Sequence, residues 1–222
     1  MLDELALAGR EHVDPAAVAV YEQKAGLDPA GDLALLRRRG LDETSTVVDL
    51  GAGTGVFAHA AAEIAGRVVA VDVSPAMVAA MRAKPGRVEV VHAGLLTYEH
   101  RGEAVDFVYS RNALHHLPDF WKAIALERIA AMLRVGGIFR LRDVVYSFDP
   151  SRASTYVEAW VARGATTPSQ GWTADELRRH VREEYSTYAW ILEGILERAG
   201  FALDEAHYDE SKVFADYVAV RR

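Results

Sequence analysis

Residues 47–64 read VVDLGAGTGVFAHAAAEI, the most informative local pattern in the chain. An apolar strand turns through Gly51, Gly53 and Gly55 and continues as an alanine-rich helix. One glycine suffices for a turn, whereas three allow a ligand to approach the backbone N–H groups at a helix start. The spacing G-x-G-x-G differs from the dinucleotide-binding G-x-G-x-x-G, and no lysine follows as in a phosphate-binding P-loop. A pyrophosphate ligand is therefore disfavoured.

Composition excludes several classes of protein. The 222 residues suit one domain, with or without an appended subdomain. A net charge of −7 argues against a broad nucleic-acid-binding face. The chain has no cysteine, so disulfides, thiolate metal sites and cysteine nucleophiles are excluded. Neither a secretory signal nor an apolar run of membrane-spanning length is recognisable, so we expect a cytoplasmic protein without a membrane partner.

Apolar runs alternate with helical ones between residues 46 and 145. Such alternation predicts an α/β fold with a parallel sheet covered on both faces. The expected strands are 46–50, 67–73, 88–92, 105–110 and 137–145, and the expected helices are 56–65, 75–82 and 119–133.

The flanking segments carry helix signals. Asp14-Pro15 and Asp28-Pro29 each combine an N-cap with proline at the first helical position, and predict helices ending before Gly26 and Gly40. Thr173-x-x-Glu176 is a capping box. A helix ending at Gly200 precedes two strands, 201–208 and 212–220, which form a hairpin-like pair.

Four segments together resemble the class I S-adenosylmethionine-dependent methyltransferases: VVDLGAGTG, VVAVDVSPAMVAAMR, VDFVYSRNALHHLPD and LRVGGIFRLRD. The resemblance covers about residues 46–145. It implies a Rossmann-like, seven-stranded, mostly parallel sheet in the order 3-2-1-4-5-7-6, with strand 7 antiparallel and helices on both faces. Residues 1–45 would be an N-terminal helical lid, and residues 46–222 the methyltransferase domain with a helical acceptor-side segment at about 150–187.

The same resemblance implies S-adenosylmethionine as the cofactor and S-adenosylhomocysteine as its product. Asp72 ends the second strand, where a carboxylate can accept hydrogen bonds from both ribose hydroxyls. At the adenine edge the family commonly has an aspartate, but HAGLLTYE contains none. Tyr21 resembles a lid tyrosine, and an ordinary packed tyrosine is an equal alternative. The implied cofactor residues are Asp49, Gly51, Ala52, Gly53 and Gly55 for the methionine portion, Asp72 for the ribose, Val73, Met77, Gly94 and Leu95 for the adenine, Ser110 and Arg111 for the methyl-donor side, and Tyr21.

The catalytic candidates follow the fourth and fifth strands. His115 or His116 is placed to act as a base, and because adjacent side chains diverge we expect at most one to face the acceptor. For each of them, a capping or packed structural histidine is the favoured alternative. Asp143 ends the fifth strand, where a structural role is an equal alternative. Arg140 and Arg142 share one face of that strand, and we expect them to pair with acids such as those of segments 127–133 or 182–186.

The acceptor pocket is expected within residues 146–190, whose aromatic side chains suit a planar or apolar acceptor. Trp190 and Ile191 are instead expected in the core. His180 and Glu184 have the i, i+4 spacing of metal ligands, but a solvated charged face is favoured, so no metal site is predicted. The aromatic residues are Tyr146, Trp160, Trp172, Tyr185, Tyr188 and Trp190.

The predicted function is methyl transfer to a small-molecule acceptor by in-line displacement. Positioning of the reactants supplies up to ~7–11 kcal/mol of such a barrier, so few catalytic residues are required. The chain has SRNA where amino-directed DNA methyltransferases carry a D/N/S-P-P-aromatic motif, and no nucleic-acid partner is expected. Two alternatives stay open: a non-catalytic S-adenosylmethionine-binding protein and a nicotinamide-dependent oxidoreductase.

Overall fold

A mostly parallel sheet organises the chain in the computed structural model, which describes residues 2–167 and 170–222. The strands are β1 (Thr46–Leu50), β2 (Arg67–Asp72), β3 (Val88–His92), β4 (Val105–Arg111), β5 (Leu133–Tyr146), β6 (Thr187–Tyr188), β7 (Phe201–Tyr208) and β8 (Phe214–Arg221). Their order is β3-β2-β1-β4-β5-β8-β7, and β8 is antiparallel to both of its neighbours. The expected order is confirmed, because β7 and β8 are the sixth and seventh strands of the prediction. The short β6, which pairs with β5, was not predicted.

Three helices begin at the caps that the sequence predicts, whereas the predicted helix 56–65 ends early, at Ala61. The side chains of Asp14, Ser74 and Thr173 each accept a backbone N–H at a helix start. Asp28 accepts the N–H of Ala30, but the helix begins after Pro29 rather than at it. The helices are α1 (Glu4–Leu7), α2 (Arg10–Val13), α3 (Pro15–Ala25), α4 (Ala30–Arg38), α5 (Val56–Ala61), α6 (Pro75–Arg82), α7 (Asp119–Met132), α8 (Ala153–Gly164), α9 (Ala174–Glu183) and α10 (Ala189–Arg198), with 3₁₀ turns at Leu114–His116 and Pro150–Arg152.

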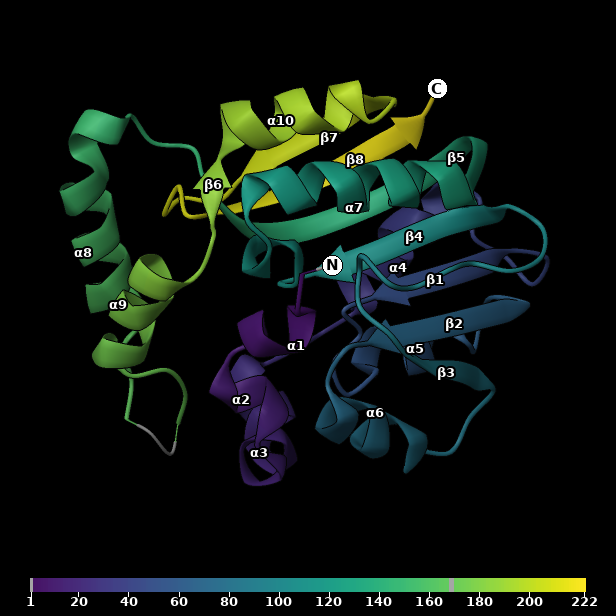
Figure 1. The fold of residues 1–222 in the computed structure, drawn as a ribbon, viewed down its shortest axis with the longest axis horizontal. Helices are drawn as coiled ribbons and strands as arrows, with labels where there is room; N and C mark the ends of the chain where they lie inside the picture. The colour runs from purple at the N-terminus through teal and green to yellow at the C-terminus, as the bar shows by residue number, and fades with distance from the viewer. Residues whose placement is uncertain (1, 168–169) are drawn as a thin grey trace.

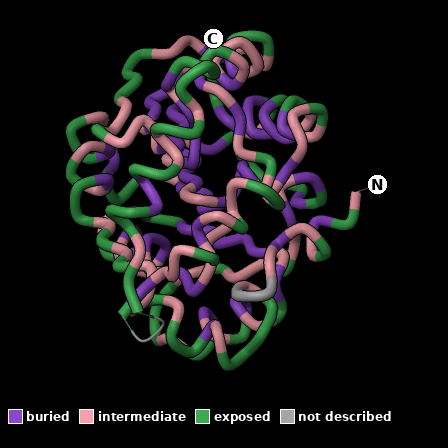
Figure 2. The backbone as a smooth tube through the Cα atoms, turned by 90° about the vertical axis from the view of Figure 1, so that its left-hand side faces the viewer, coloured by how far each residue is buried: buried purple, intermediate pink, exposed green. Residues whose placement is uncertain are grey.

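Each face of the sheet has its own apolar core, because successive strand residues point to opposite sides. On one face Val48 and Val69 pack with Leu126 of α7 and Leu196 of α10. On the other face the core includes residues of α4, α5 and α6. Figure 1 shows α7 and α10 over the near face and α4 and α5 behind, and Figure 2 shows the buried backbone running through the middle of the molecule.

Two groups of helices stand beyond the carboxyl ends of the central strands, toward which the arrowheads of β1 and β4 point (Figure 1). One group is α1–α3, and the other is the pair α8–α9. In open α/β sheets, ligands bind outside the carboxyl ends of the strands. The helix α4 differs from α1–α3, because its Leu36 is fully buried in the main core. Only the part of residues 1–45 before α4 therefore has the position expected of a lid.

Two predictions about packing need correction. Arg140 and Arg142 pair with acids, as expected, but the acids are Asp32 of α4 and Asp216 of β8 rather than those of segments 127–133 or 182–186. The expected core position of Trp190 is wrong. Trp190 is 67% exposed, because α10 directs Ala189, Leu192 and Leu196 into the core and leaves position 190 on its outer side. Within the described residues, no helix is long and apolar enough to cross a membrane.

Candidate functional site

Three adjoining cavities lie at the carboxyl ends of the strands. The loop cavity, about 40 Å³, borders the glycine turn after β1. The β2 cavity, about 70 Å³, borders the end of β2, and the α9 cavity, about 240 Å³, is walled by α8 and α9. Tyr21 and Asn112 line all three, so these two residues mark the point where the cavities meet.

The glycine turn has two structural glycines and one that faces open space. All three have positive φ, between 57° and 79°. A Cβ on Gly51 would lie 2.3 Å from the Cβ of Ala113, and one on Gly55 would lie 2.6 Å from Met81. On Gly53 it would meet only Tyr21, at 3.9 Å. The close-approach argument of the sequence analysis therefore applies to Gly53, whereas the other two positions are constrained by packing as well.

Asp49, near the end of β1, has a buried carboxyl group that is incompletely paired. It is 2% exposed, and its Oδ2 has no hydrogen-bond partner. Burial and the nearby Asp72 raise the pKa of Asp49 well above its usual value. Asp49, Ala52 and Gly53 line the loop cavity, whereas Gly55 does not. An unpaired buried carboxyl oxygen beside a cavity favours a cationic or hydrogen-bond-donating ligand there.

Asp72 is held at the end of β2 by two backbone groups. Its carboxylate accepts the N–H of Gly53 at 2.7 Å and the N–H of Ser74 at 2.8 Å. Burial raises the pKa of Asp72 to about 6, although these hydrogen bonds oppose the shift. Asp72 thus fixes the glycine turn and also lines the β2 cavity, where its remaining lone pairs are available to a ligand.

The β2 cavity contains a residue that sequence analysis missed. Val73, Met77 and Leu95 line it as expected of an adenine-flanking set, but Gly94 does not. The space in front of Gly94 is filled by Glu4 of α1, whose carboxylate accepts the N–H of Leu96 at 3.1 Å. Burial raises the pKa of Glu4 above its usual value, against the effect of these backbone hydrogen bonds.

At the end of β4, Ser110 and Arg111 were expected to share a role, but they face different surroundings. Ser110 is fully buried, donates to the carbonyl of Leu50 at 2.8 Å and lines none of the three cavities, so the structure gives its expected place beside the methyl donor no support. Arg111 lines the loop and β2 cavities. The next residue, Asn112, was missed; its φ of 51° turns the chain into the cavities, and asparagine is among the residues that tolerate this conformation.

The N-terminal helices reach over the junction of the cavities. The rings of His12 and Tyr21 lie 5.2 Å apart, and His12 lies 5.3 Å from His116. Lys24 of α3 pairs with Glu176 of α9 at 2.7 Å and lies 4.2 Å above the ring of Trp172. Residues 4–25 therefore contact both the β2 side and the α9 side of the site.

The two adjacent histidines both line the α9 cavity, contrary to the expectation that at most one would. The 3₁₀ turn at Leu114–His116 places their ring centroids 4.3 Å apart. Asp143 lines no cavity and instead binds Nδ1 of His115. Burial would lower the pKa of His115, but Asp143 and Glu184 raise it to about 9. Burial and the neighbouring His115 hold the pKa of His116 well below its usual range, and its buried Nδ1 has no hydrogen-bond partner.

The predicted solvated face of α9 is wrong for two residues. The side chains of His180 and Glu184 are only 17% and 15% exposed, and both line the α9 cavity. The carboxylate of Glu184 lies 3.0 Å from Nε2 of His115, a contact that the sequence analysis did not predict. Of the predicted aromatic residues, Trp160 and Trp172 line the cavity; Tyr146, Tyr185, Tyr188 and Trp190 do not.

Comparisons with known proteins agree with this geometry. A family model described as a methyltransferase domain matches residues 47–137. An uncharacterized methyltransferase of Mycobacterium bovis is 31% identical over 156 residues, covering 63% of this chain and 77% of that protein. The trans-aconitate 2-methyltransferase of Azoarcus is 30% identical over 176 residues, covering 75% and 68%. The structure of magnesium protoporphyrin IX methyltransferase from Synechocystis with bound S-adenosylmethionine aligns with a TM-score of 0.60, at 15% identity, over 99% of this chain and 92% of that one. At that identity the structural likeness concerns the fold.

Proposed function

The chain belongs to the class I S-adenosylmethionine-dependent methyltransferase family, and we propose that it methylates a small molecule held in the α9 cavity. The observation that carries this proposal is the placement of a cavity of about 240 Å³ directly against the two cavities at the ends of β1 and β2. Family membership decides against the nicotinamide-dependent alternative. The adjoining cavity argues against a protein that only binds the cofactor.

The residues present fit the cofactor. S-adenosylmethionine, when bound, supplies a methyl group on a sulfonium with a good leaving group. The unpaired Asp49 Oδ2 suits the cationic methionine portion, and Gly53 lets that portion approach the backbone. Asp72 would accept hydrogen bonds from the ribose, with Val73, Met77 and Leu95 around the adenine. We assign the adenine amino group to Glu4, which brings a carboxyl group to the place where the family commonly has an aspartate.

The size and lining of the α9 cavity favour a small acceptor. Its volume is below the roughly 300–1,000 Å³ of sites for drug-sized ligands. One wall is apolar and aromatic, with Trp160, Trp172 and Phe214, and the opposite wall carries the histidines and Glu184. An acceptor with a planar or apolar part and one polar, reacting end satisfies both walls. The relative named for trans-aconitate acts on a molecule of this size class, whereas a porphyrin exceeds the cavity.

The protein would contribute to the reaction mainly by positioning the acceptor relative to the methyl group. Tyr21 and Asn112 stand where the cavities meet, so they would align the acceptor with the methyl group and exclude water. His116 lines both the β2 and the α9 cavity, and its unpartnered Nδ1 makes it the better-placed residue to contact the reacting end of the acceptor. His115 is held by Asp143 and Glu184, and it would keep the polar wall of the α9 cavity, including the neighbouring His116, in a fixed orientation. The helices α1–α3 would act as the lid over the bound cofactor.

Calorimetric titration with S-adenosylmethionine and S-adenosylhomocysteine tests the cofactor site, and we expect micromolar binding. Small carboxylic acids and phenols would then be screened as acceptors by the formation of S-adenosylhomocysteine. Folded protein, free of copurified ligand, that binds neither compound would contradict the proposal. Binding of the cofactor with methylation only of macromolecules would contradict its small-molecule half.

A further inference from the structure

We propose that His115, His180 and Glu184 form a binding site for a divalent transition metal in the wall of the α9 cavity. The candidate ligand atoms, one from each residue, all lie within 4.8 Å of one another. Glu184 Oε2 is 3.0 Å from His115 Nε2 and 2.5 Å from His180 Nδ1. Ligand atoms around a tetrahedral zinc ion lie roughly 3.4 Å apart, so these two separations are shorter than in an occupied site and would each widen by less than about 1 Å to admit the ion.

The outer nitrogens of both histidines are already engaged, which is the second observation. His115 Nδ1 binds the buried carboxylate of Asp143, and His180 Nε2 lies 3.1 Å from the hydroxyl of Ser186. Metal-binding histidines characteristically donate the other ring N–H to a carboxylate or another acceptor, which fixes the ring and its tautomer. Here that arrangement directs His115 Nε2 and His180 Nδ1 toward the same carboxylate oxygen.

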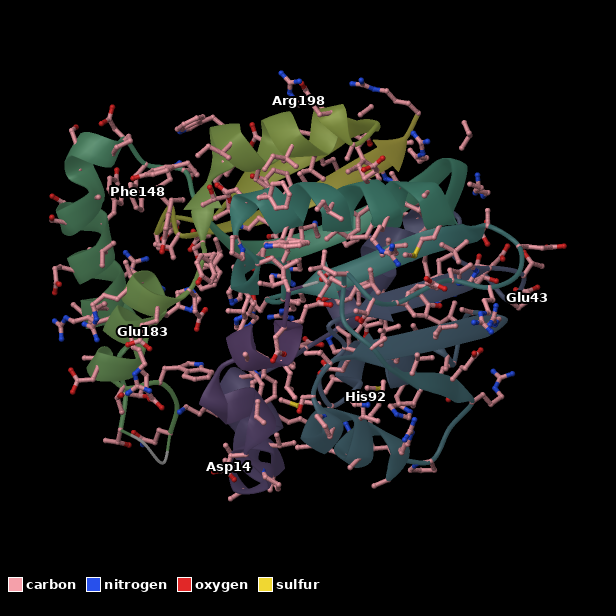
Figure 3. All side chains as sticks on the ribbon, viewed as in Figure 1. Asp14, Glu43, His92, Phe148, Glu183 and Arg198 are labelled. Atoms are coloured by element: carbon pink, nitrogen blue, oxygen red, sulfur yellow. The ribbon has the colours of Figure 1, made fainter. Side chains whose placement is uncertain are left out.

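Glu184 supplies the third observation. Its buried Oε2 is approached by one imidazole nitrogen from each of His115 and His180, at 3.0 Å and 2.5 Å. Its carboxylate lies between two separate elements, the 3₁₀ turn after β4 and the helix α9, and Glu183 marks the end of α9 in Figure 3. A simple ion pair requires one imidazole beside the acid, whereas two imidazole nitrogens converging on one carboxylate oxygen provide a set of three ligands.

Nitrogen and oxygen ligands without thiolates suit Zn²⁺, Co²⁺, Ni²⁺ or Fe²⁺ better than Mg²⁺ or Ca²⁺, which prefer oxygen alone. Three protein ligands leave coordination positions open, as in catalytic rather than structural metal sites. All three residues line the α9 cavity, so the open positions face the proposed acceptor. The site thereby narrows the acceptor class to molecules that offer a carboxylate or hydroxyl oxygen to the ion, and this step rests on the proposed function.

The test uses untagged protein stripped with a chelator and dialysed. Titration with CoCl₂, followed by visible absorption, and with ZnCl₂, followed by calorimetry, should show one ion per chain with micromolar or tighter affinity. His180→Ala and Glu184→Gln should each weaken binding at least 100-fold, and Ser186→Ala by 10-fold or more. The matched control is His207→Ala, which removes an imidazole that is 74% exposed on β7 and should leave binding unchanged.

Binding of S-adenosylmethionine is measured on the same samples, so the two proposals fail separately. Folded protein that binds S-adenosylmethionine but takes up neither Co²⁺ nor Zn²⁺ would overturn the metal site and leave the proposed function standing. Unchanged metal affinity in Glu184→Gln, which keeps the size of the side chain, would also overturn it. Metal binding without cofactor binding would instead contradict the proposed function. A change in the Co²⁺ spectrum on adding a small carboxylic acid, absent in the two ligand variants, is the expected signature of the acceptor class.

Discussion

Two buried charged clusters flank β5 and differ in what surrounds them. The paired cluster, Asp32 with Arg140, Arg142 and Asp216, lies on the α4 side of the sheet. The open cluster, His115 with Asp143, His180 and Glu184, lies at the other side and borders the α9 cavity. Both contain buried charged residues and both perturb pKa values, so neither property separates structure from function. What separates them is the cavity beside the open cluster and the adjacent His116, whose buried Nδ1 has no hydrogen-bond partner.

Two buried aspartates show the same contrast. Burial would raise the pKa of Asp32, but Arg140 and Arg142 hold it below its usual value. Asp49 has no such partner, and burial raises its pKa well above the usual value. A buried carboxylate that is fully paired stabilises the fold, whereas one left unpaired beside a cavity costs stability until a ligand arrives. The following variants test this distinction.

Removing Asp32 should have the largest effect on stability. Asp32→Ala leaves the guanidinium groups of the buried Arg140 and of Arg142 with Asp216 as their one remaining anion, and should lower the free energy of unfolding by about 3 kcal/mol. Urea unfolding of the ligand-free protein measures the loss. The control is Asp204→Ala, which breaks a pair between Arg39 and a side chain that is 47% exposed, and should cost at most about 1 kcal/mol. Equal losses would remove the distinction between buried and exposed pairs.

Asp72 should destabilise the ligand-free protein when it ionises. Burial raises its pKa to about 6 in the folded protein, from an ordinary value of 3.8 for an aspartate. The folded state therefore holds a proton that the unfolded state releases, and stability decreases as pH rises through this range. Between pH 4.5 and pH 7 the contribution lost is about 2 kcal/mol.

The measurement is the difference in unfolding free energy between the wild-type protein and Asp72→Asn at those two pH values. The difference should shift in favour of the variant at pH 7, while the variant's affinity for S-adenosylmethionine falls. A pH-independent difference would show that Asp72 is not the titrating group.

The contiguous part of the site was predictable, and the part assembled from distant residues was not. Asp49, Gly53, Asp72 and Met77 lie within two strand-to-helix turns whose periodicity and glycines are visible locally. The strand order required the family resemblance. Glu4 meets Gly94 across ninety positions of sequence, and His115 meets Glu184 across sixty-nine, so no local pattern indicates either contact.

The errors have the same origin. The acids that pair with Arg140 and Arg142 were sought in neighbouring helices, but tertiary packing supplies Asp32 and Asp216. Trp190 was assigned to the core from its apolar character, whereas the direction of α10 exposes it. Asn112 carried a weak signal, as an asparagine at the end of a strand, but only the structure shows that it lies where the three cavities meet.

Gly53 and Gly26 provide a matched pair for the close-approach argument. Their φ angles are 57° and 55°, and a Cβ would meet nothing within 4 Å at Gly26 and only Tyr21 at Gly53. Alanine at either position therefore incurs the same backbone strain, about 1–2 kcal/mol. Gly53→Ala should weaken S-adenosylhomocysteine binding at least tenfold in calorimetry, whereas Gly26→Ala should leave it unchanged. Equal affinities would show that the ligand does not approach the backbone at position 53.

Replacing Glu4 should have the smallest effect. The variant tests whether a carboxylate that already binds the backbone also binds the ligand. Its carboxylate already accepts the N–H of Leu96, so the Glu4→Ala variant loses both an anchor of α1 and the proposed contact with the adenine amino group. We expect S-adenosylhomocysteine to bind about 1 kcal/mol more weakly, roughly fivefold. S-inosylhomocysteine, which has an oxo group in place of that amino group, should lose less affinity than S-adenosylhomocysteine, because only the loss of the α1 anchor affects it.

The control for Glu4 is Asp3→Ala, which removes the N-cap of α1 and leaves the carboxylate at position 4 in place. If both variants weaken the two nucleosides equally, Glu4 only anchors the N-terminal helix. If only Glu4→Ala loses the preference for adenine over hypoxanthine, then a residue from outside the sheet supplies the recognition that strand β3 lacks. Selectivity, rather than affinity, is therefore the decisive quantity, because loss of the anchor affects both ligands while loss of the amino-group contact affects one.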